Sequence, residues 1–366
     1  MCAGPAAELA LTLSVLTGAP DDAAAQVIPS APVGGHDDLP AVLEFAAHCD
    51  VVTFDHEHVP PDVLAALVAS GVALHPSPQA LVYAQDKLAM RRRLTDLGMP
   101  CPRWAGVAGT AELAEFGDAT GWPVILKTPR GGYDGKGVRL IASPHEADDW
   151  FERAADTDTV LLAEEAVSFT RELAALVARS PSGQAAAWPV VETVQTDGIC
   201  TDVIAPAPGL AESAAAQATS VALTIAEKLE VTGVLAVEMF QTVEGTVLVN
   251  ELAMRPHNSG HWTMDGAVTG QFEQHLRAVL DLPLGSTRAH QPWTVMANVL
   301  GGTREDLYAA YLHVMARDPG AKIHLYGKAV RPGRKIGHVT VTGADLDTVR
   351  TRARHAADYL EGTVSE

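Results

Sequence analysis

Two glutamates interrupt a pair of strongly apolar segments in the second half of the chain. Glu238 lies in VLAVEMF, residues 234 to 240, and Glu251 lies in GTVLVNELA, residues 245 to 253. The short polar connection predicts a β-hairpin, which places the two carboxylates on neighbouring antiparallel strands. Burying two like charges requires a cation, and Mg²⁺ prefers one or two carboxylates together with phosphate oxygens. The hairpin, with Asn250 nearby, therefore predicts a magnesium–nucleotide site; the alternative places both glutamates on a solvent-facing side.

A glycine-rich loop, GGYDGKG, occupies residues 131 to 137 between the apolar runs PVILKTP and GVRLIAS. These runs predict a β-hairpin over residues 122 to 142 with a long tip. Glycines at this density let backbone amides approach a phosphate closely, although an ordinary flexible hairpin explains the loop equally well. The loop matches neither G-x-x-x-x-G-K-S/T nor G-x-G-x-x-G, so the standard mononucleotide and dinucleotide fingerprints fail. Another nucleotide-binding fold must be considered.

Charged residues lie at the ends of two further apolar strands. Lys127 follows VIL, where an ammonium is costly unless it meets an anion. Glu164 and Glu165 end the short strand in TVLLAEEAV, and Glu172 follows a few residues later. Their carboxylates can accept hydrogen bonds from an adenine amine and from ribose hydroxyls, while the backbone that follows faces the base edge. Taken one at a time, such strand-end charges are usually just solvated.

A dense polar loop follows directly after Glu251. The segment MRPHNSGHW, residues 254 to 262, holds five polar or charged side chains: Arg255, His257, Asn258, Ser259 and His261. The guanidinium of Arg255 has the planar fork that suits a carboxylate or bicarbonate. A lone histidine is more often structural, but five polar groups beside a predicted metal site favour a functional pocket.

The formal net charge of −19 limits the partners that the chain can bind. Such a field repels nucleic-acid phosphates and anionic lipid, so we expect neither a nucleic-acid nor a membrane partner. An anionic ligand then needs a local basic island. KAVRPGRK, residues 328 to 335, has four cations in eight residues and suits a sugar phosphate. The run Arg91 to Arg93 lies in a predicted helix and is expected to form a solvated face.

Composition predicts a globular, unexported protein. Hydrophobic residues make up 47% of the 366 residues and charged residues 19%, enough for a sizeable core. The start, MCAGPAAELA, lacks the basic flank of a signal peptide, and no apolar run reaches about 18 residues. Cys2, Cys49, Cys101 and Cys200 are scattered without a C-x-x-C pair, which favours a reducing cytoplasm over a disulfide framework or a zinc site.

The first hundred residues show the alternation of a parallel α/β sheet. Strands are predicted at residues 9–16, 50–54 and 72–76, and helices at residues 5–10, 39–48, 61–70 and 79–98. The last helix ends at Gly98 with Pro100 behind it. Later in the chain the clearest predictions are a helix over residues 211 to 229 and a strand over residues 335 to 343.

Six segments together resemble the ATP-grasp superfamily and, within it, the 5-(carboxyamino)imidazole ribonucleotide synthases of purine biosynthesis. They are collinear over nearly the whole chain: TFDHEHVP, AQDKLAMRRRL, KTPRGGYDGKG, AEEAV with FTREL, NELAMRPHNSGHWT and RPGRKIGH. The combination of GGYDGKG with NELAMRPHNSGHW is specific, whereas the glycine loop alone is weak.

The resemblance implies a mixed α/β and α+β ATP-grasp fold. An open parallel α/β preATP-grasp domain is expected over residues 1–95, a small lid domain over 96–167, a catalytic domain over 168–300 and a small β-rich C-terminal subdomain over 301–366. Family members begin with a strand and a glycine-rich turn before the first helix. This sequence starts inside that helix, so we expect the first sheet to lack its first strand and to have unpaired edges.

The resemblance also implies the reaction. ATP, bicarbonate and 5-aminoimidazole ribonucleotide would give the carboxyamino product, ADP and phosphate through carboxyphosphate, with Mg²⁺ as the metal and a homodimer as the assembly. The matching positions are Lys87, Lys127, Glu164, Glu165, Val167, Glu172 and Asn250 for ATP; Glu238 and Glu251 for the metal; Arg255, His257 and Asn258 for bicarbonate and its phosphorylated form; and Tyr133, Asp134, Lys136, Lys328, Arg334 and Lys335 for the ribonucleotide, with Asp134 as general base.

Two rival interpretations stay open at this point. One is a related ATP-grasp ribonucleotide ligase, such as a formate-using transformylase. The other is a nucleotide-binding protein without turnover, which the incomplete start of the first domain suggests.

Overall fold

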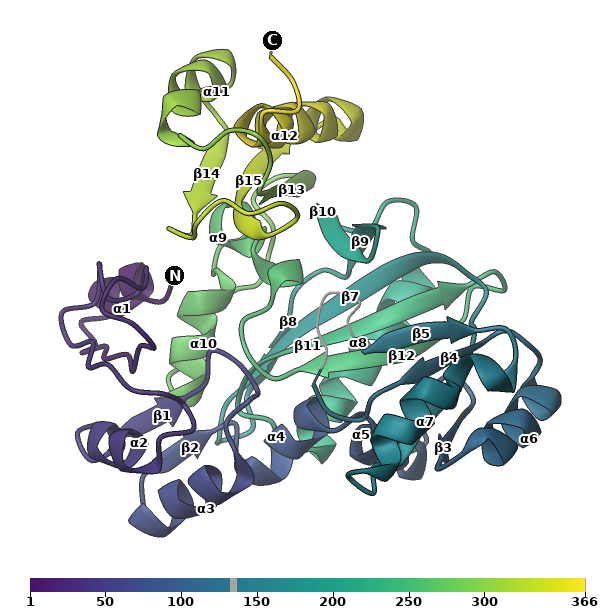
Figure 1. Ribbon diagram of the computed structural model, residues 1–366. Coiled ribbons are helices and arrows are strands. Elements are labelled where there is room, and N and C mark those ends of the chain that lie inside the picture. Colours follow the sequence, from purple (N-terminus) through teal and green to yellow (C-terminus); the bar gives the residue numbers. More distant parts are fainter. Residues whose placement is uncertain (132–136, 366) are drawn as a thin grey trace.

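The computed structural model describes residues 1–131 and 137–365, whose strands form three sheets (Figure 1). A two-stranded sheet lies near the N-terminus, a four-stranded sheet follows, and a nine-stranded sheet continues into the C-terminal part. The two-stranded sheet and the four-stranded sheet lie at opposite sides of the large sheet, and the C-terminal helices lie at its far end (Figure 1). Within the described ranges no helix is both long and apolar enough to span a bilayer.

The N-terminal part contains the predicted parallel βαβ unit. Strands β1 (Val51–Thr53) and β2 (Ala73–His75) pair in parallel, and α3 (Pro61–Ser70) connects them. Helices α1 (Ala3–Glu8) and α2 (Leu39–Ala46) precede this unit.

The strand predicted over residues 9–16 is wrong. This segment makes one isolated parallel bridge, Ser14 with Ser30, and Thr17 just after it makes another with Val33. Its partner segment contains Pro29 and Pro32, which have no backbone N–H to donate to a ladder. Among the described residues, the first sheet therefore consists of β1 and β2 alone.

The single helix predicted over residues 79–98 is two helices. Helix α4 (Pro78–Gln85) ends and α5 (Lys87–Asp96) begins at Asp86, whose backbone is extended, with φ −133° and ψ 108°. The Asp86 carboxylate accepts a hydrogen bond from the Ala89 amide at 3.0 Å. Aspartate is a preferred N-cap because it satisfies an otherwise unpaired amide, so the second helix starts at Lys87.

The four-stranded antiparallel sheet has the order β3–β6–β4–β5. Its strands are β3 (Trp104–Val107), β4 (Val124–Lys127), β5 (Val138–Ile141) and β6 (Leu161–Glu165). Helices α6 (Thr110–Thr120) and α7 (Asp148–Ala155), with the short η1 (Pro144–Ala147), flank it, and its buried core includes Leu113 and Phe151. The antiparallel pairing of β4 with β5 confirms the hairpin predicted around the glycine-rich loop.

The nine-stranded sheet has the order β12–β11–β7–β9–β10–β13–β15–β14, with β8 paired to β7. Its strands are β7 (Phe169–Arg179), β8 (Ala185–Ala187), β9 (Val191–Thr196), β10 (Ile199–Ala205), β11 (Gly233–Thr242), β12 (Val247–Ala253), β13 (Trp293–Leu300), β14 (Lys322–Leu325) and β15 (Lys335–Gly343). The β11–β12 hairpin and β15 confirm two sequence predictions.

Helix α8 (Glu212–Lys228) covers one face of this sheet, so the side chains on the other face point away from α8. Leu173, Val237 and Met239 belong to the same buried cluster as the apolar residues of α8. Because successive side chains of a strand point to opposite faces, Glu172 and Glu238 lie on the other face. In Figure 1, α8 lies behind the sheet, with β7, β11 and β12 in front of it.

The C-terminal part extends the large sheet instead of forming one of its own. Strand β13 pairs with both β10 and β15, and α12 (Leu346–Glu361) packs on β13 and β15. The remaining helices are η2 (Asn258–Gly260), α9 (Thr263–Gly266), α10 (Gln271–Val279), η3 (Tyr308–Ala310) and α11 (Tyr311–Arg317). The division predicted between residues 300 and 301 therefore falls within a continuous sheet, and the four domain boundaries stay predictions.

Candidate active site

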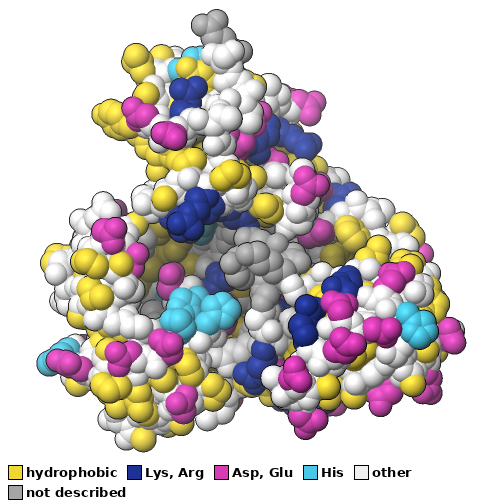
Figure 2. Space-filling view, in the orientation of Figure 1, with side chains coloured by type: hydrophobic (Ala, Val, Ile, Leu, Met, Phe, Trp, Pro, Cys, Tyr) yellow, Lys and Arg dark blue, Asp and Glu magenta, His cyan; other side chains and the backbone are white. Residues whose placement is uncertain are grey.

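A cleft of about 2320 Å³ lies between the three sheets and brings the predicted site residues together. Figure 2 shows this hollow in the middle of the molecule, with lysine, arginine and histidine side chains around it. Every predicted site residue that the structure describes lines it: Lys87, Lys127, Glu164, Glu165, Val167, Glu172, Glu238, Asn250, Glu251, Arg255, His257, Asn258, Lys328, Arg334 and Lys335. Tyr133, Asp134 and Lys136 lie outside the described residues.

The two hairpin glutamates lie opposite one another. Glu238 of β11 pairs with Glu251 of β12, and the next pair along is Met239 with Val249. Asn250 is therefore the extra residue of a β-bulge. In a regular strand Asn250 and Glu251 would point to opposite faces, but both line the cleft here. The bulge thus adds an amide to the pair of carboxylates.

Each hairpin carboxylate has a basic partner. Lys87 Nζ lies 2.8 Å from Glu251 Oε1, and His257 Nε2 lies 3.2 Å from Glu238 Oε1. His257 Nδ1 accepts from the Ser259 amide, so the ring proton is on Nε2, facing Glu238. Burial would raise the pKa of Glu238, but the hydrogen bond from His257 and the positive charges nearby, including Lys335 and Arg255, hold the pKa below its usual value. Glu238 is thus kept as a carboxylate.

A buried ion cluster lies beside Asn250. Glu164, 2% exposed, accepts from Arg91 Nε with one oxygen, and its other oxygen lies 2.7 Å from Lys127 Nζ. Lys127 Nζ also reaches Asn250 Oδ1 at 3.2 Å, and Arg91 Nη2 donates to the Asn250 carbonyl at 2.7 Å. Burial would raise the pKa of Glu164, but the charges of Arg91 and Lys127 lower it. Glu164 is therefore a buried carboxylate held between two cations.

The expectation that Arg91 to Arg93 form a solvated face is wrong for Arg91, which is 0% exposed. Arg91 follows Leu88 by three residues and precedes Leu94 by three, so it lies on the buried stripe of α5. That spacing was the signal in the sequence. Of the other two arginines, Arg92 is exposed to solvent and Arg93 is partly buried.

The loop after β12 is held by residues distant in the sequence. Arg255 Nε lies 2.9 Å from Glu57 Oε2, and Glu57 is 9% exposed in the loop after β1. The side-chain amides of Asn258 and Asn298 bond to each other in both directions at 2.9 Å. Glu57 was part of the TFDHEHVP segment, but nothing local in the sequence pairs it with Arg255. The contact fixes the guanidinium at the cleft wall.

Two further carboxylates, Glu165 and Glu172, line the cleft. Glu165 Oε2 lies 2.7 Å from Arg103 Nε, and Val167 lines the cleft two residues later. Burial and the nearby charge of Glu238 raise the pKa of Glu172 to about 7, against a hydrogen bond from Gln195 that lowers it.

The basic island reaches the same cleft. Lys328, Arg331, Arg334 and Lys335 all line it, although Arg331 was not among the predicted site residues. Lys328 Nζ lies 5.3 Å from the centre of the Tyr326 ring. The positive charge of Lys335 also contributes to the low pKa of Glu238, so the basic island lies close enough to Glu238 to act on it electrostatically.

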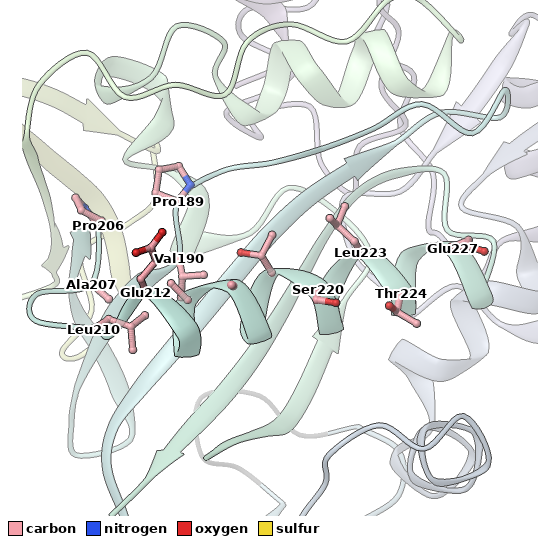
Figure 3. Close-up of a pocket in the computed structure, with 13 residues that line it drawn as sticks. Pro189, Val190, Pro206, Ala207, Leu210, Glu212, Ser220, Leu223, Thr224 and Glu227 are labelled. Atoms are coloured by element: carbon pink, nitrogen blue, oxygen red, sulfur yellow. The ribbon is translucent and has the colours of Figure 1, made fainter. Parts of the chain in front are cut away.

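A smaller hollow of about 690 Å³ lies along α8 (Figure 3). Pro189, Pro206, Leu210 and Leu223 are among the residues that line it. It contains none of the predicted site residues, and its lining is largely apolar.

Three protein-family models match the chain in series. A ribonucleotide synthetase preATP-grasp domain matches residues 1–85, an ATP-grasp domain residues 92–272, and a phosphoribosylaminoimidazole carboxylase C-terminal domain residues 294–352. An N5-carboxyaminoimidazole ribonucleotide synthase from Mycobacterium tuberculosis is 54% identical over 355 residues, covering 96% of this chain and 83% of the relative. The chain belongs to the N5-carboxyaminoimidazole ribonucleotide synthase family. Another such synthase, from Corynebacterium ammoniagenes, is 46% identical over 97% of this chain and 87% of its own length.

Solved structures of N5-carboxyaminoimidazole ribonucleotide synthases have the same fold. The protein from Thermus thermophilus is 38% identical, with a TM-score of 0.86 over 100% of this chain and 96% of its own. The protein from Aspergillus clavatus, solved with ADP and 5-aminoimidazole ribonucleotide, is 32% identical, with a TM-score of 0.88 over 99% and 95%. The predicted ATP-grasp fold is confirmed, and so is the prediction of an ATP-dependent ligase.

Proposed function

We propose that this chain joins bicarbonate to 5-aminoimidazole ribonucleotide at the expense of ATP, giving 5-(carboxyamino)imidazole ribonucleotide, ADP and phosphate in purine biosynthesis. The observation that carries the proposal is that one cleft holds all the groups named next. Glu238 and Glu251 face it from paired strands, and the same cleft holds Lys127, Arg255 and Lys335. These groups suit, in turn, a metal, the nucleotide, bicarbonate and a sugar phosphate.

The chemistry has two stages. An oxygen of bicarbonate attacks the γ-phosphorus of ATP, and ADP leaves with the bonding electrons, which gives carboxyphosphate. The exocyclic amine of the ribonucleotide then bonds to the carboxyl carbon, directly or after release of carbon dioxide, and phosphate leaves. The amine loses its proton to a base, the role that the resemblance gives to Asp134, which lies outside the described residues. A closed cleft protects the intermediate from water.

The hairpin fits Mg²⁺. Within the described residues no group of three or more His, Cys, Asp or Glu side chains forms a metal site of its own. Mg²⁺ commonly uses one or two carboxylates and completes its shell with water and substrate phosphates, which matches the opposed Glu238 and Glu251. When bound, the ion neutralises charge on the phosphates.

The cations around the hairpin would bind and orient the nucleotide. Lys87 Nζ contacts Glu251, and Lys127 Nζ contacts Asn250, so both ammonium groups lie next to the carboxylates that would hold the metal. We assign the base and ribose of ATP to the stretch from Glu165 through Val167 to Glu172, which lines the cleft.

The other two substrates would occupy the part of the cleft around Glu238. Arg255, oriented by Glu57, offers its fork to bicarbonate, and His257 carries a proton on the nitrogen that faces Glu238. Asn258 lines the same wall. Lys328, Arg334 and Lys335 would bind the phosphate of the ribonucleotide. We also expect a homodimer located in the cytoplasm.

Labelled product formation tests the proposed function. The chain should release ADP from ATP only when bicarbonate is present, and 5-aminoimidazole ribonucleotide should stimulate the release. Carbon from labelled bicarbonate should appear in the product. Activity with formate in place of bicarbonate would instead indicate a transformylase, and ADP binding without turnover would indicate a non-catalytic protein.

A further inference from the structure

Arg91 lies behind the cleft wall, where three parts of the fold meet. It belongs to α5, and its guanidinium contacts Glu164 of β6, in the four-stranded sheet, and Asn250 of β12, in the nine-stranded sheet. Glu164, Asn250 and Lys127 line the cleft, whereas Arg91 is fully buried behind them. Any effect of Arg91 on a ligand must therefore pass through these neighbours.

The charges of this cluster do not cancel. Arg91 and Lys127 are two cations, and Glu164 is the carboxylate that both of them contact. A buried cluster with one excess positive charge is costly unless an anion approaches it. Of the two cations, only Lys127 faces the cleft, so the excess charge is available on that side. A nucleotide phosphate is an anion of the right kind.

We propose that Arg91 is a positioning residue for nucleotide binding, acting through Glu164 and Asn250. By holding one oxygen of Glu164, it prevents that carboxylate from fully neutralising Lys127. By holding the Asn250 carbonyl, it fixes the bulge that carries Glu251. The inference rests on the proposed function for its ligand class, and it adds a residue that does not itself touch the cleft.

The same contacts give Glu164 a different role from the one that the resemblance suggests. Both of its oxygens face cations, Arg91 on one side and Lys127 on the other. Both oxygens are therefore already paired with cations, and we assign the side chain to balancing the charge of Lys127.

Equilibrium binding of Mg·ADP to the full-length chain tests the proposal, because ADP binding does not depend on carboxylation. The variant Arg91→Met should raise the Kd for Mg·ADP about tenfold, as expected for loss of a charge-assisted contact. The matched control is Arg92→Met, one residue along the same helix but exposed, which should leave the Kd unchanged.

A rescue experiment separates positioning from a purely structural role. Adding Glu164→Gln to Arg91→Met removes the carboxylate that would otherwise neutralise Lys127, so the Kd should recover at least about threefold relative to Arg91→Met. If Arg91 only ties the two sheets together, the double variant should bind no better than the single one, and the proposal would be overturned.

Arg91→Lys keeps the proposal testable if Arg91→Met does not fold, because it keeps a positive charge at this buried position. An ammonium lacks the planar fork that holds Glu164 and the Asn250 carbonyl together, so the Kd for Mg·ADP should still rise about threefold. A Kd equal to that of the unsubstituted chain would overturn the proposal. An unsubstituted chain that binds ADP but shows no bicarbonate-dependent turnover would contradict the proposed reaction and leave this inference intact.

Discussion

His257 Nε2 lies 3.2 Å from the carboxylate of Glu238 and directs its ring proton towards it. This pair joins the two halves of the site: the hairpin that would hold the metal and the loop that would hold bicarbonate. The geometry follows from the chain, because the loop begins directly after β12 and folds back over β11. Because the imidazole donates a hydrogen bond to Glu238, the carboxylate has a partner and stays negatively charged.

The variant Glu251→Gln should lose turnover by roughly two to three orders of magnitude, because part of the charge stabilisation of the phosphates is lost. Its thermal unfolding should stay close to that of the unsubstituted chain, since the Glu251 side chain is 41% exposed. Steady-state ADP release measures the effect. Glu244→Gln, on the exposed turn of the same hairpin, is the control and should retain activity. Full activity of Glu251→Gln would remove the metal assignment.

The variant Glu57→Gln should raise the KM for bicarbonate about tenfold and leave the KM for ATP unchanged. Glu57 contacts Arg255 at 2.9 Å, and loss of its charge frees the guanidinium from its position in the wall. The measurement is ADP release as a function of bicarbonate concentration, with exposed Glu44→Gln as the control. An equal rise in both KM values would contradict a specific role of this pair at the bicarbonate side.

Stability of the ligand-free chain should depend on pH through Glu172, whose pKa burial and the charge of Glu238 raise to about 7. A carboxyl with a raised folded-state pKa stabilises the fold below its unfolded pKa, and this contribution is lost as the pH rises through the folded value. Glu172→Gln should therefore be more stable than the unsubstituted chain at pH 8.5, by about 2 kcal/mol.

The difference caused by Glu172→Gln should shrink towards pH 5, where the glutamate is protonated in the folded chain. Thermal unfolding at several pH values without Mg²⁺ or nucleotide measures it. The Glu244→Gln variant should show no such trend. A difference that is the same at pH 5 and pH 8.5 would mean that Glu172 does not titrate in this range.

The C-terminal part should show the opposite dependence at Asp318. The Arg352 guanidinium contacts both carboxylate oxygens, at 2.8 and 2.5 Å, and lowers the pKa of Asp318. A lowered pKa stabilises the fold above the unfolded value, near 4, and the stabilisation is lost as the pH falls through the folded value. Asp318→Asn should destabilise the chain by about 1–2 kcal/mol at pH 7.

The effect of Asp318→Asn should diminish as the pH falls below about 4, because the unsubstituted chain then loses the same charge. Urea unfolding of Asp318→Asn and of the unsubstituted chain, at pH 7 and at pH 3.5, measures this difference, with exposed Glu305→Gln as the control. A constant difference between the two pH values would contradict an ionic contribution of this pair.

The sequence was sufficient wherever the determining pattern is local. The β11–β12 hairpin and the β4–β5 hairpin follow from apolar runs and turn residues, and the predicted site residues within the described ranges all line one cleft. Tertiary context decided the rest. Asp86 breaks a continuous helical pattern by capping the next helix, and Asn250 forms a bulge that alternation does not reveal.

Long-range charge pairs were the least predictable feature. In the sequence Arg91 looks like part of a basic surface run, and its burial is explained by its partners Glu164 and Asn250, which are 73 and 159 residues away. Glu57 and Arg255 are 198 residues apart. A charged residue at a buried helix position destabilises the fold unless it is paired. The spacing of Arg91 between Leu88 and Leu94 therefore indicated that Arg91 has a partner, but only the structure shows which residues those partners are.

Transfer of ¹⁸O from bicarbonate to phosphate tests the central claim most directly, because attack on the γ-phosphorus leaves one bicarbonate oxygen in the phosphate that is released. The unsubstituted chain, given ATP, Mg²⁺, 5-aminoimidazole ribonucleotide and ¹⁸O-labelled bicarbonate, should release inorganic phosphate that carries the label in step with formation of the carboxyamino product. Phosphate that contains only oxygen from ATP and water, alongside product formation, would show that bicarbonate is not phosphorylated in this cleft and would contradict the account.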